Sequence, residues 1–242
     1  MTDRSDLLDK MDSDLLESAV KLATIFKDKG GSLLLVGGSV RDLILNQSPH
    51  ELDFEARGPS LEEIKTWLSK DFRYDEVGKA FGVLRIKGYP IELALPRTET
   101  KSGTGHKGFD VQIDPKLPFE RAVQRRDFTI NALGLCPLTG QLLDPCDGSS
   151  DIHSRILRHI GPAFCEDPLR VLRGMQFIAR FELTPLPETV DICKSMNMED
   201  LAPERIFEEW KKLILKGINL SDGLNFLKNT TWVRYFPELA AL

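Results

Sequence analysis

The residues Leu35-Val36-Gly37-Gly38-Ser39-Val40-Arg41-Asp42, followed by Glu51-Leu52-Asp53-Phe54-Glu55, decide how this chain is interpreted. The apolar run before the glycines predicts a buried strand, and a glycine pair lets the backbone approach a phosphate closely. A helix that opens after the glycines presents backbone N–H groups to an anion, and Arg41 lies within reach of the same anion. The stretch therefore predicts a strand–turn–helix unit that binds phosphate. The alternative is an ordinary tight turn with a solvated Arg41.

The acidic residues that follow alternate with apolar residues, as on a strand with one buried face. Side chains two positions apart on a strand point to the same face, so Glu51 and Asp53, or Asp53 and Glu55, can lie side by side. Two carboxylates are what a Mg²⁺ site usually requires, with phosphate oxygens and water completing the shell. The spacing leaves both pairs open, and a solvated strand edge is the remaining alternative.

Composition limits the class of protein. The chain has 242 residues, 41% of them hydrophobic and 29% charged, which is typical of a globular protein with one large domain or two small ones. The acidic N-terminus lacks an apolar signal core, which predicts a cytoplasmic protein. The four cysteines form no CxxC pair, so we expect reduced thiols. The net charge of −5 counts mildly against a nucleic-acid partner and requires any such binding to use a local basic patch.

Apolar periodicity predicts an α+β chain, with a small mixed β-sheet flanked by helices and an all-helical region after it. We expect a helical extension over 1–31, a catalytic head domain over 32–160, and a helical neck and partial body over 161–242, with no strand after about residue 165. Ser60 and Glu63 fit a capping box at the start of a helix. The expected strands are 32–36, 52–55, 72–77, 83–87 and 91–95; the expected helices are 5–29, 40–45, 60–69, 169–181, 187–196, 204–215 and 221–228; a long loop is expected over 98–118.

Two further motifs carry polar residues at positions that suit a nucleotide. Glu92 interrupts the apolar run Ile91–Leu95, where it can supply a third metal ligand with Arg97 near for phosphate, although a lone strand glutamate is more often simply exposed. Two arginines lead the run from Arg125 to Ala132, and an arginine fork suits phosphate. Asp127 and Asn131 of that run can bond ribose hydroxyls. A salt-bridged helix start is the alternative.

The run Glu166-Asp167-Pro168-Leu169-Arg170-Val171-Leu172-Arg173 predicts a helix start with Pro168 in the first turn. Asp167 and Arg170 are three positions apart and therefore neighbours on the helix. A carboxylate accepts from an exocyclic amine and an arginine donates to a ring acceptor, so the pair can bind the edge of cytosine or adenine. The alternative is a local ion pair with acids favoured by the helix dipole.

In this order the motifs resemble those of the bacterial tRNA nucleotidyltransferase and poly(A) polymerase family, class II of the polymerase-β-like superfamily. The matching stretches include LVGGSVRD, ELDFE, RRDFTINAL, LLDPCDG and EDPLRVLRGMQFIARF, within residues 35–181, with weaker similarity through ERIFEEWKKLIL. The stretch IELALPRTETKSGTGHKGF matches as well, and within it the segment 97–103, followed by Gly105 and His106, resembles the CCA-adding branch more than the poly(A) polymerases.

The resemblance implies a role for each acid. Glu51 and Asp53 match the metal-binding pair, which is conventionally two aspartates, and the register follows from counting out from the glycine pair. Glu55 is then an extra acid, and Asp53 with Glu55 remains the rival pair. Glu92 matches the third carboxylate. The cofactor implied is Mg²⁺, with two metal ions.

The resemblance also implies which residues bind the nucleotide and the RNA. The segment 98–112 matches a flexible loop tied to the switch from C to A addition, and the partner implied is the 3′ end of tRNA. The nucleotide positions are Gly37, Gly38 and Arg41 for the triphosphate, with Arg97 near it; Arg126, Asp127 and Asn131 for ribose and phosphate; and Asp167 and Arg170, with Arg173 beside them, for the choice of CTP and ATP.

The reaction implied is the template-independent transfer of CMP and AMP from CTP and ATP to a tRNA 3′ end, with release of pyrophosphate. A CC-adding, A-adding or poly(A) polymerase activity is the alternative in the same chemistry, and a non-catalytic RNA-binding paralogue is the alternative in another class. The segment 98–112 argues against CC-only addition, and Glu51 in place of aspartate is the one hint of a decayed site. Relatives continue beyond the helical region, so we expect either a catalytic fragment or a compact member, and a weak grip on tRNA.

Overall fold

The computed structural model describes residues 2–77, 82–101, 109–199 and 201–239. The chain divides into two compact units. The sheet unit comprises residues 1–100, 111–125 and 130–152, and the helical unit comprises residues 101–110, 126–129 and 153–242.

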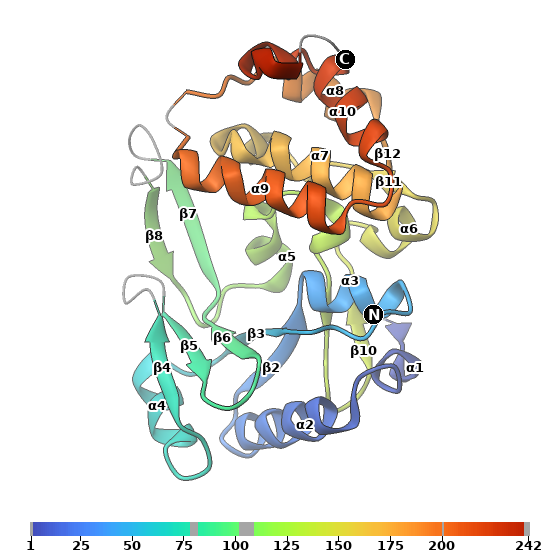
Figure 1. The fold of residues 1–242 in the computed structure, drawn as a ribbon. Coiled ribbons are helices and arrows are strands. Elements are labelled where there is room, and N and C mark those ends of the chain that lie inside the picture. Colours follow the sequence, from blue (N-terminus) through green and yellow to red (C-terminus); the bar gives the residue numbers. More distant parts are fainter. Residues whose placement is uncertain (1, 78–81, 102–108, 200, 240–242) are drawn as a thin grey trace. The chain divides into compact units, whose positions relative to one another are not determined.

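A mixed β-sheet forms the core of the sheet unit, as predicted (Figure 1). The strands β3 and β6 run parallel at its centre, while β2 pairs antiparallel with β3 and β5 pairs antiparallel with β6. Because β3 and β6 are parallel, they present their chain starts at the same edge. In spatial order the strands are β1 (Thr2–Asp3), β10 (Gln141–Leu143), β9 (Gly134–Leu135), β2 (Ser32–Val36), β3 (Leu52–Arg57), β6 (Ile91–Ala94), β5 (Val83–Ile86) and β4 (Tyr74–Val77).

The helices of the sheet unit pack beside this sheet. The helix α2 lies against β2, and Phe26 of α2 meets Trp67 of α4 edge to face, with ring centroids 5.5 Å apart. The predicted capping box is confirmed, because Ser60 and Glu63 bond each other's backbone N–H groups. The helices are α1 (Ser5–Leu8), α2 (Ser13–Asp28), α3 (Gly38–Ile44), α4 (Leu61–Leu68), α5 (Phe119–Ala122), η1 (Val123–Arg125) and α6 (Gly148–His153), with η2 (Thr129–Asn131) shared between the units.

Two expectations for local structure before residue 120 are wrong. The helix expected over 5–29 is broken after α1, because the Asp12 side chain accepts hydrogen bonds from the N–H groups of Asp14 and Leu15 and so starts a new helix. The segment expected as a loop over 98–118 contains the paired strands β7 (Arg97–Lys101) and β8 (Phe109–Ile113). Residues 102–108, the centre of the predicted switch loop, lie outside the described residues.

The helical unit is built around α7, against which both α9 and α10 pack (Figure 1). Trp232 is fully buried and donates from Nε1 to the carbonyl of Cys193 at 2.9 Å. The expectation of no strand after about residue 165 is wrong, because β12 pairs in parallel with β11. The elements are β11 (Ile156–Leu157), η3 (Pro162–Glu166), α7 (Leu169–Phe181), β12 (Thr184–Pro185), α8 (Pro187–Lys194), α9 (Pro203–Lys216), α10 (Leu220–Asn229), η4 (Trp232–Tyr235) and η5 (Pro237–Leu239).

Within the described residues, no helix is long and apolar enough to cross a membrane.

Candidate active site

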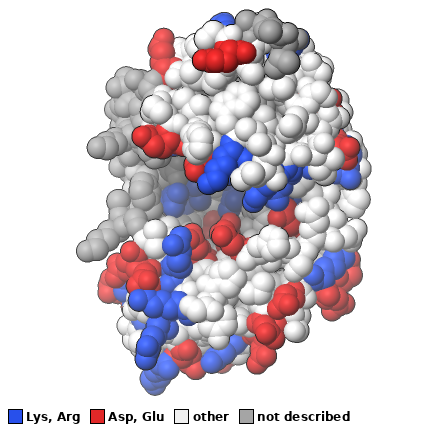
Figure 2. Space-filling model, viewed as in Figure 1, with Lys and Arg blue, Asp and Glu red and all other residues white. Residues whose placement is uncertain are grey.

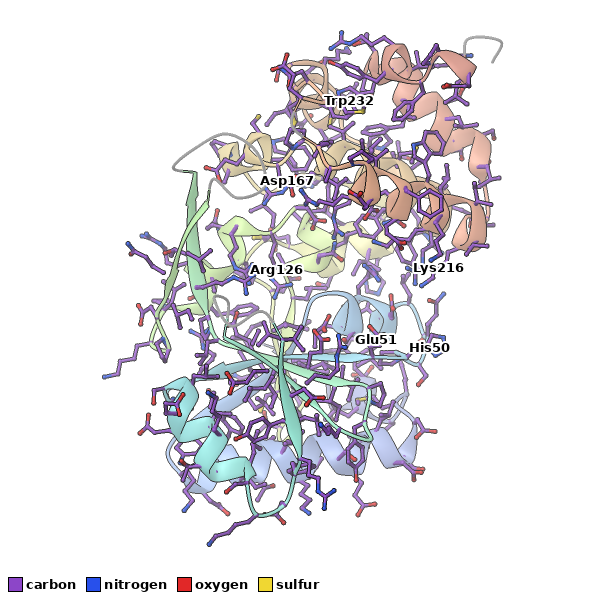
Figure 3. The ribbon with its side chains drawn as sticks, turned by 60° about the vertical axis from the view of Figure 1, so that its left-hand side comes forward. His50, Glu51, Arg126, Asp167, Lys216 and Trp232 are labelled. Atoms are coloured by element: carbon purple, nitrogen blue, oxygen red, sulfur yellow. The ribbon has the colours of Figure 1, made fainter. Side chains whose placement is uncertain are left out.

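The central strands bring two of the predicted metal ligands together. Asp53 of β3 lies directly opposite Glu92 of β6 in the parallel register. Residues opposite each other in a pair of strands put their side chains on the same face. The two carboxylates, 39 positions apart in the chain, therefore emerge side by side. The exposed Glu51, which Figure 3 labels, lies just before β3.

The hydroxyl of Ser39 ties the turn after β2 to the backbone that carries Asp53. It donates to the carbonyl oxygen of Glu51 at 3.0 Å and accepts from the Asp53 N–H at 3.2 Å. Ser39 is 4% exposed. One buried hydroxyl thus fixes the start of β3 relative to the first turn of α3, which sets where the acids lie beside the glycine pair.

Arg85 of β5 lies opposite Glu92 on its other side and forms an ion pair with it, with Nη2 and Oε1 2.5 Å apart. The hydrogen bond to Glu92 raises the pKa of Arg85 above its usual value, and Glu51 adds a smaller attraction. Both acids therefore lie within the field of this guanidinium. Sequence patterning did not single out Arg85, since a cation on an exposed strand face is ordinary.

The rival ligand Glu55 has a different environment. It is 3% exposed and forms an ion pair with Arg57, whose guanidinium also bonds the carbonyl of Leu117. Its cross-strand neighbour on β6 is Ala94 instead of an acid. Burial beside a cation makes Glu55 a structural partner of Arg57, and this favours Asp53 with Glu92 as the carboxylates that face solvent.

The glycine turn has the backbone that its sequence predicts. Gly37 is the N-cap of α3 at φ 68°, in the left-handed region where a side chain is strained. A Cβ on Gly38 would lie 3.3 Å from Nη2 of Arg41. The turn therefore requires glycine at its first position and leaves little room at its second.

Arg41 lies inside the sheet unit. It is 5% exposed, donates from Nε and Nη2 to Asp42 Oδ1 at 2.9 and 2.7 Å, and donates from Nη1 to Asn131 Oδ1 at 2.6 Å. These bonds hold the amide of Asn131, itself 6% exposed, beside the glycine turn. The contact of Arg41 with phosphate therefore stays a prediction. In the structure its guanidinium is buried and bonds Asp42 and Asn131.

Asp127 and Arg173, both expected to bind nucleotide, are bound to each other in the helical unit. Arg173 donates to Asp127 Oδ2 from Nε at 2.7 Å and from Nη2 at 2.6 Å. Asp127 Oδ1 accepts from the N–H of Phe128, whose ring packs against Phe164 and Phe177. Burial lowers the pKa of Arg173, but attraction to Asp127 and Glu209 outweighs it, so the pKa is raised overall. The guanidinium therefore stays charged.

Asp167, which Figure 3 labels, comes just before α7, and Arg170 lies in its first turn, as predicted. Asp167 Oδ1 accepts from the N–H of Leu169 at 3.1 Å, and Arg205 of α9 donates to Oδ2 at 2.8 Å. Arg170 donates from Nη1 to the carbonyl of Ala163 at 2.8 Å. Both side chains that we expect to choose the base are thus oriented by the protein.

The remaining predicted residues, Arg97 and Arg126, belong to different units. Arg97 begins β7 in the sheet unit, and Arg126 belongs to the helical unit, where Figure 3 labels it. Among the described residues, no group of three or more His, Cys, Asp or Glu side chains is close enough to hold a metal. The sheet unit therefore offers a two-carboxylate site, Asp53 with Glu92, which fits a Mg²⁺ ion whose other ligands are phosphate and water.

Sequence reasoning missed four polar residues that hold the candidate site in place. Ser39 and Arg85 act in the sheet unit, and Arg205 and Glu209 act in the helical unit. Arg205 and Glu209 are four positions apart on a predicted helix, and this spacing indicates that they lie on the same face of it. Nothing in the sequence indicated which residues that face would meet.

The fold and these motifs agree with a known family. The family model described as "Poly A polymerase head domain" matches residues 33–158, which is more than half of the chain. The chain belongs to this family, which confirms the resemblance.

Relatives narrow the comparison to one branch. A "Multifunctional CCA protein" of Xylella fastidiosa is 42% identical over 221 residues, covering 86% of this chain and 50% of the relative. A solved CCA-adding enzyme of Bacillus stearothermophilus in complex with CTP has a TM-score of 0.74 at 26% identity, over 88% of this chain and 51% of that one. The Thermotoga maritima CCA-adding enzyme complexed with tRNA_CCA has the same fold, with a TM-score of 0.79 at 23% identity over 96% and 55%. This chain spans about half the length of the curated relatives it matches.

Proposed function

We propose that this chain is a CCA-adding tRNA nucleotidyltransferase, which transfers CMP and AMP from CTP and ATP to the 3′ end of tRNA. The observation that carries the proposal is the register that puts Asp53 opposite Glu92, beside the turn at Gly37 and Gly38. Carboxylates next to a phosphate-binding turn are the arrangement that phosphoryl and nucleotidyl transfer require. The names of its relatives support the CCA-adding branch.

In this proposal Asp53 and Glu92 would hold Mg²⁺, and the exposed Glu51, just before β3, is the further candidate ligand. A Mg²⁺ ion held there would supply Lewis-acid chemistry, lowering the pKa of the attacking hydroxyl and offsetting the charge of the pyrophosphate leaving group. The chain's own residues do the rest: the turn at Gly37 and Gly38 seats the triphosphate, and Ser39 keeps the acids in register with it. The reaction is in-line attack by the RNA 3′ hydroxyl on the α-phosphate, with pyrophosphate leaving.

Selection of the nucleotide rests on the helical unit in this proposal. The carboxylate of Asp167 accepts from the exocyclic amine of cytosine or adenine, and Arg170 donates to the neighbouring ring nitrogen. Asp127, held by Arg173, bonds the ribose, and Arg126 and Asn131 complete the ribose and phosphate contacts. Uracil and guanine present a carbonyl where the amine would be and are rejected by the negative charge.

The RNA partner and the wider organisation belong to the same proposal. On the face that Figure 2 shows, lysine and arginine side chains are interspersed with aspartate and glutamate side chains. A surface of mixed sign holds a phosphate backbone weakly, so we expect a weak grip on tRNA. A filter-binding series against salt measures it, and a dissociation constant as tight as that of longer relatives would contradict this expectation. The domain limits 1–31, 32–160 and 161–242 and a cytoplasmic location remain predictions.

An incorporation assay tests the proposed function. The purified chain is incubated with Mg²⁺, labelled CTP or ATP, and tRNA transcripts that end before CCA, after C, and after CC. We expect C on the first two and A on the third. Asp53→Asn should abolish incorporation, whereas Asp75→Asn, a matched change on the exposed strand β4, should not.

The outcomes separate the alternatives. If no transcript is extended, the proposed enzymatic activity is refuted, and the non-catalytic RNA-binding paralogue is the alternative that is left. Addition of C alone, of A alone, or of a long A tail would instead identify the CC-adding, A-adding or poly(A) polymerase activity.

A further inference from the structure

A charged side chain from a second helix fixes the orientation of Asp167. Arg205, in the first turn of α9, donates from Nη2 to Asp167 Oδ2 at 2.8 Å and from Nη1 to Oδ1 at 3.4 Å. Oδ1 also accepts from the Leu169 N–H at 3.1 Å. The two side chains are 26% and 22% exposed. A guanidinium fork on a carboxylate sets the plane of the carboxylate as well as its position.

The same face of α9 reaches a second nucleotide-binding residue one turn later. Glu209 lies four positions after Arg205 and is 2% exposed. Its Oε1 lies 3.9 Å from Nη1 of Arg173, which in turn holds Asp127 through two hydrogen bonds. Lys212 balances Glu209 at 2.7 Å. The helix α9 therefore bonds Asp167 directly and reaches Asp127 only indirectly, through the looser ion pair of Glu209 with Arg173.

We infer that Arg205 is a positioning residue that sets base selectivity by holding the carboxylate of Asp167 toward the exocyclic amine of cytosine or adenine. The inference rests on the proposed function and adds to it a residue on α9 that does not itself touch the base. Each carboxylate oxygen has two acceptor sites, so binding Arg205 and the Leu169 N–H leaves acceptor capacity for the base.

The physical reason lies in what a fixed carboxylate can reject. A carboxylate held in one plane accepts from an amine at one position and repels a carbonyl oxygen there. Once Arg205 is removed, the side chain of Asp167 is free to rotate about its χ angles, and its alignment with the base edge must be restored at the moment of binding. Affinity for the correct bases then falls, while the already poor affinity for uracil and guanine changes little, so discrimination shrinks.

Two variants of the 242-residue chain and a matched control test this inference. Arg205→Gln keeps an amide donor but removes the fork and the charge, and Arg205→Lys keeps the charge without the bidentate geometry. Lys211→Gln, on the same helix, removes an exposed ion pair with Glu208. Equilibrium titration with CTP, ATP, UTP and GTP, without RNA, gives four affinities for each protein, and thermal unfolding reports folding. Incorporation kinetics separate KM from kcat.

We expect Arg205→Gln to lower the affinity for CTP and for ATP about tenfold and to leave the affinities for UTP and GTP nearly unchanged. In the incorporation kinetics it should raise KM more than it lowers kcat. Arg205→Lys should restore part of the selectivity, and Lys211→Gln should match the wild type. An equal loss for all four nucleotides, or unchanged selectivity in a folded Arg205→Gln protein, would overturn the inference while the proposed function stands. A wild-type chain that binds neither CTP nor ATP would refute the proposed function itself.

Discussion

Replacing Arg41 by methionine tests the buried position of this residue. The substitution keeps a long side chain but removes the hydrogen bonds of the guanidinium, among them two to Asp42 and one to Asn131. The side chains of Arg41 and Asp42 are 6% and 18% exposed, so water replaces little of what is lost. Removing one partner of a buried ion pair costs about 3–5 kcal/mol. Because Asp42 keeps some contact with water, we expect about 3 kcal/mol.

Urea unfolding followed by circular dichroism measures the change. The midpoint should fall while the slope against denaturant stays the same, since the surface exposed on unfolding is unchanged. The matched control is Lys87→Met, which removes an ion pair to Asp75 whose side chains are 53% and 60% exposed. An exposed pair contributes about 0–1 kcal/mol, so the control should unfold almost as the wild type does.

The result that would refute the reasoning is a loss no larger than that of Lys87→Met. Arg41 would then be solvated, as in the alternative interpretation of the sequence, and its removal would have no cost in stability. A large loss of stability places Arg41 among the residues that hold the glycine turn and Asn131 together.

Three further changes follow from local packing and titration. Trp232→Ala should lower the free energy of unfolding by about 3–5 kcal/mol, measured by chemical denaturation, since it empties a fully buried site and removes the bond to the Cys193 carbonyl. Gly140→Ala should lower the melting temperature, because Gly140 has φ +65° and its Cβ would lie 2.4 Å from Ser5 Cα; an unchanged melting temperature would contradict this. Burial lowers the pKa of His159, so the stability from its neutral form is fully present above its unfolded pKa of about 6.5 and is lost as the pH falls from there through the lower pKa of the folded state. His159→Gln should therefore lose less stability than the wild type between pH 7.5 and 5.5, and parallel pH curves would contradict the assignment.

The sequence predicted local structure well where the signal was local. The helix Leu169–Phe181 and the strand Ser32–Val36 have the bounds expected from apolar periodicity, and the capping box of Ser60 formed as predicted. It failed where short polar contacts or distant pairing decide: Asp12 splits a helix whose apolar positions continue past it, and Thr184–Pro185 becomes a strand because Ile156–Leu157 lies beside it.

The candidate site shows the same division. Motifs in the sequence named Asp53, Glu92 and Asp167 as acids to examine. Their partners lie far along the chain, with Glu92 opposite Asp53 through strand register and Arg205 on Asp167 through helix packing.

The sequence by itself therefore determined the family, the α+β class and the residue types that the chemistry needs, because motifs and periodicity are properties of consecutive residues. Tertiary structure alone decided that Arg41 is buried, that Glu55 is neutralised by Arg57, and that α9 holds Asp167. Burial and ion pairing depend on which segments, far apart in the sequence, come into contact in the fold. A pattern of consecutive residues does not specify those contacts.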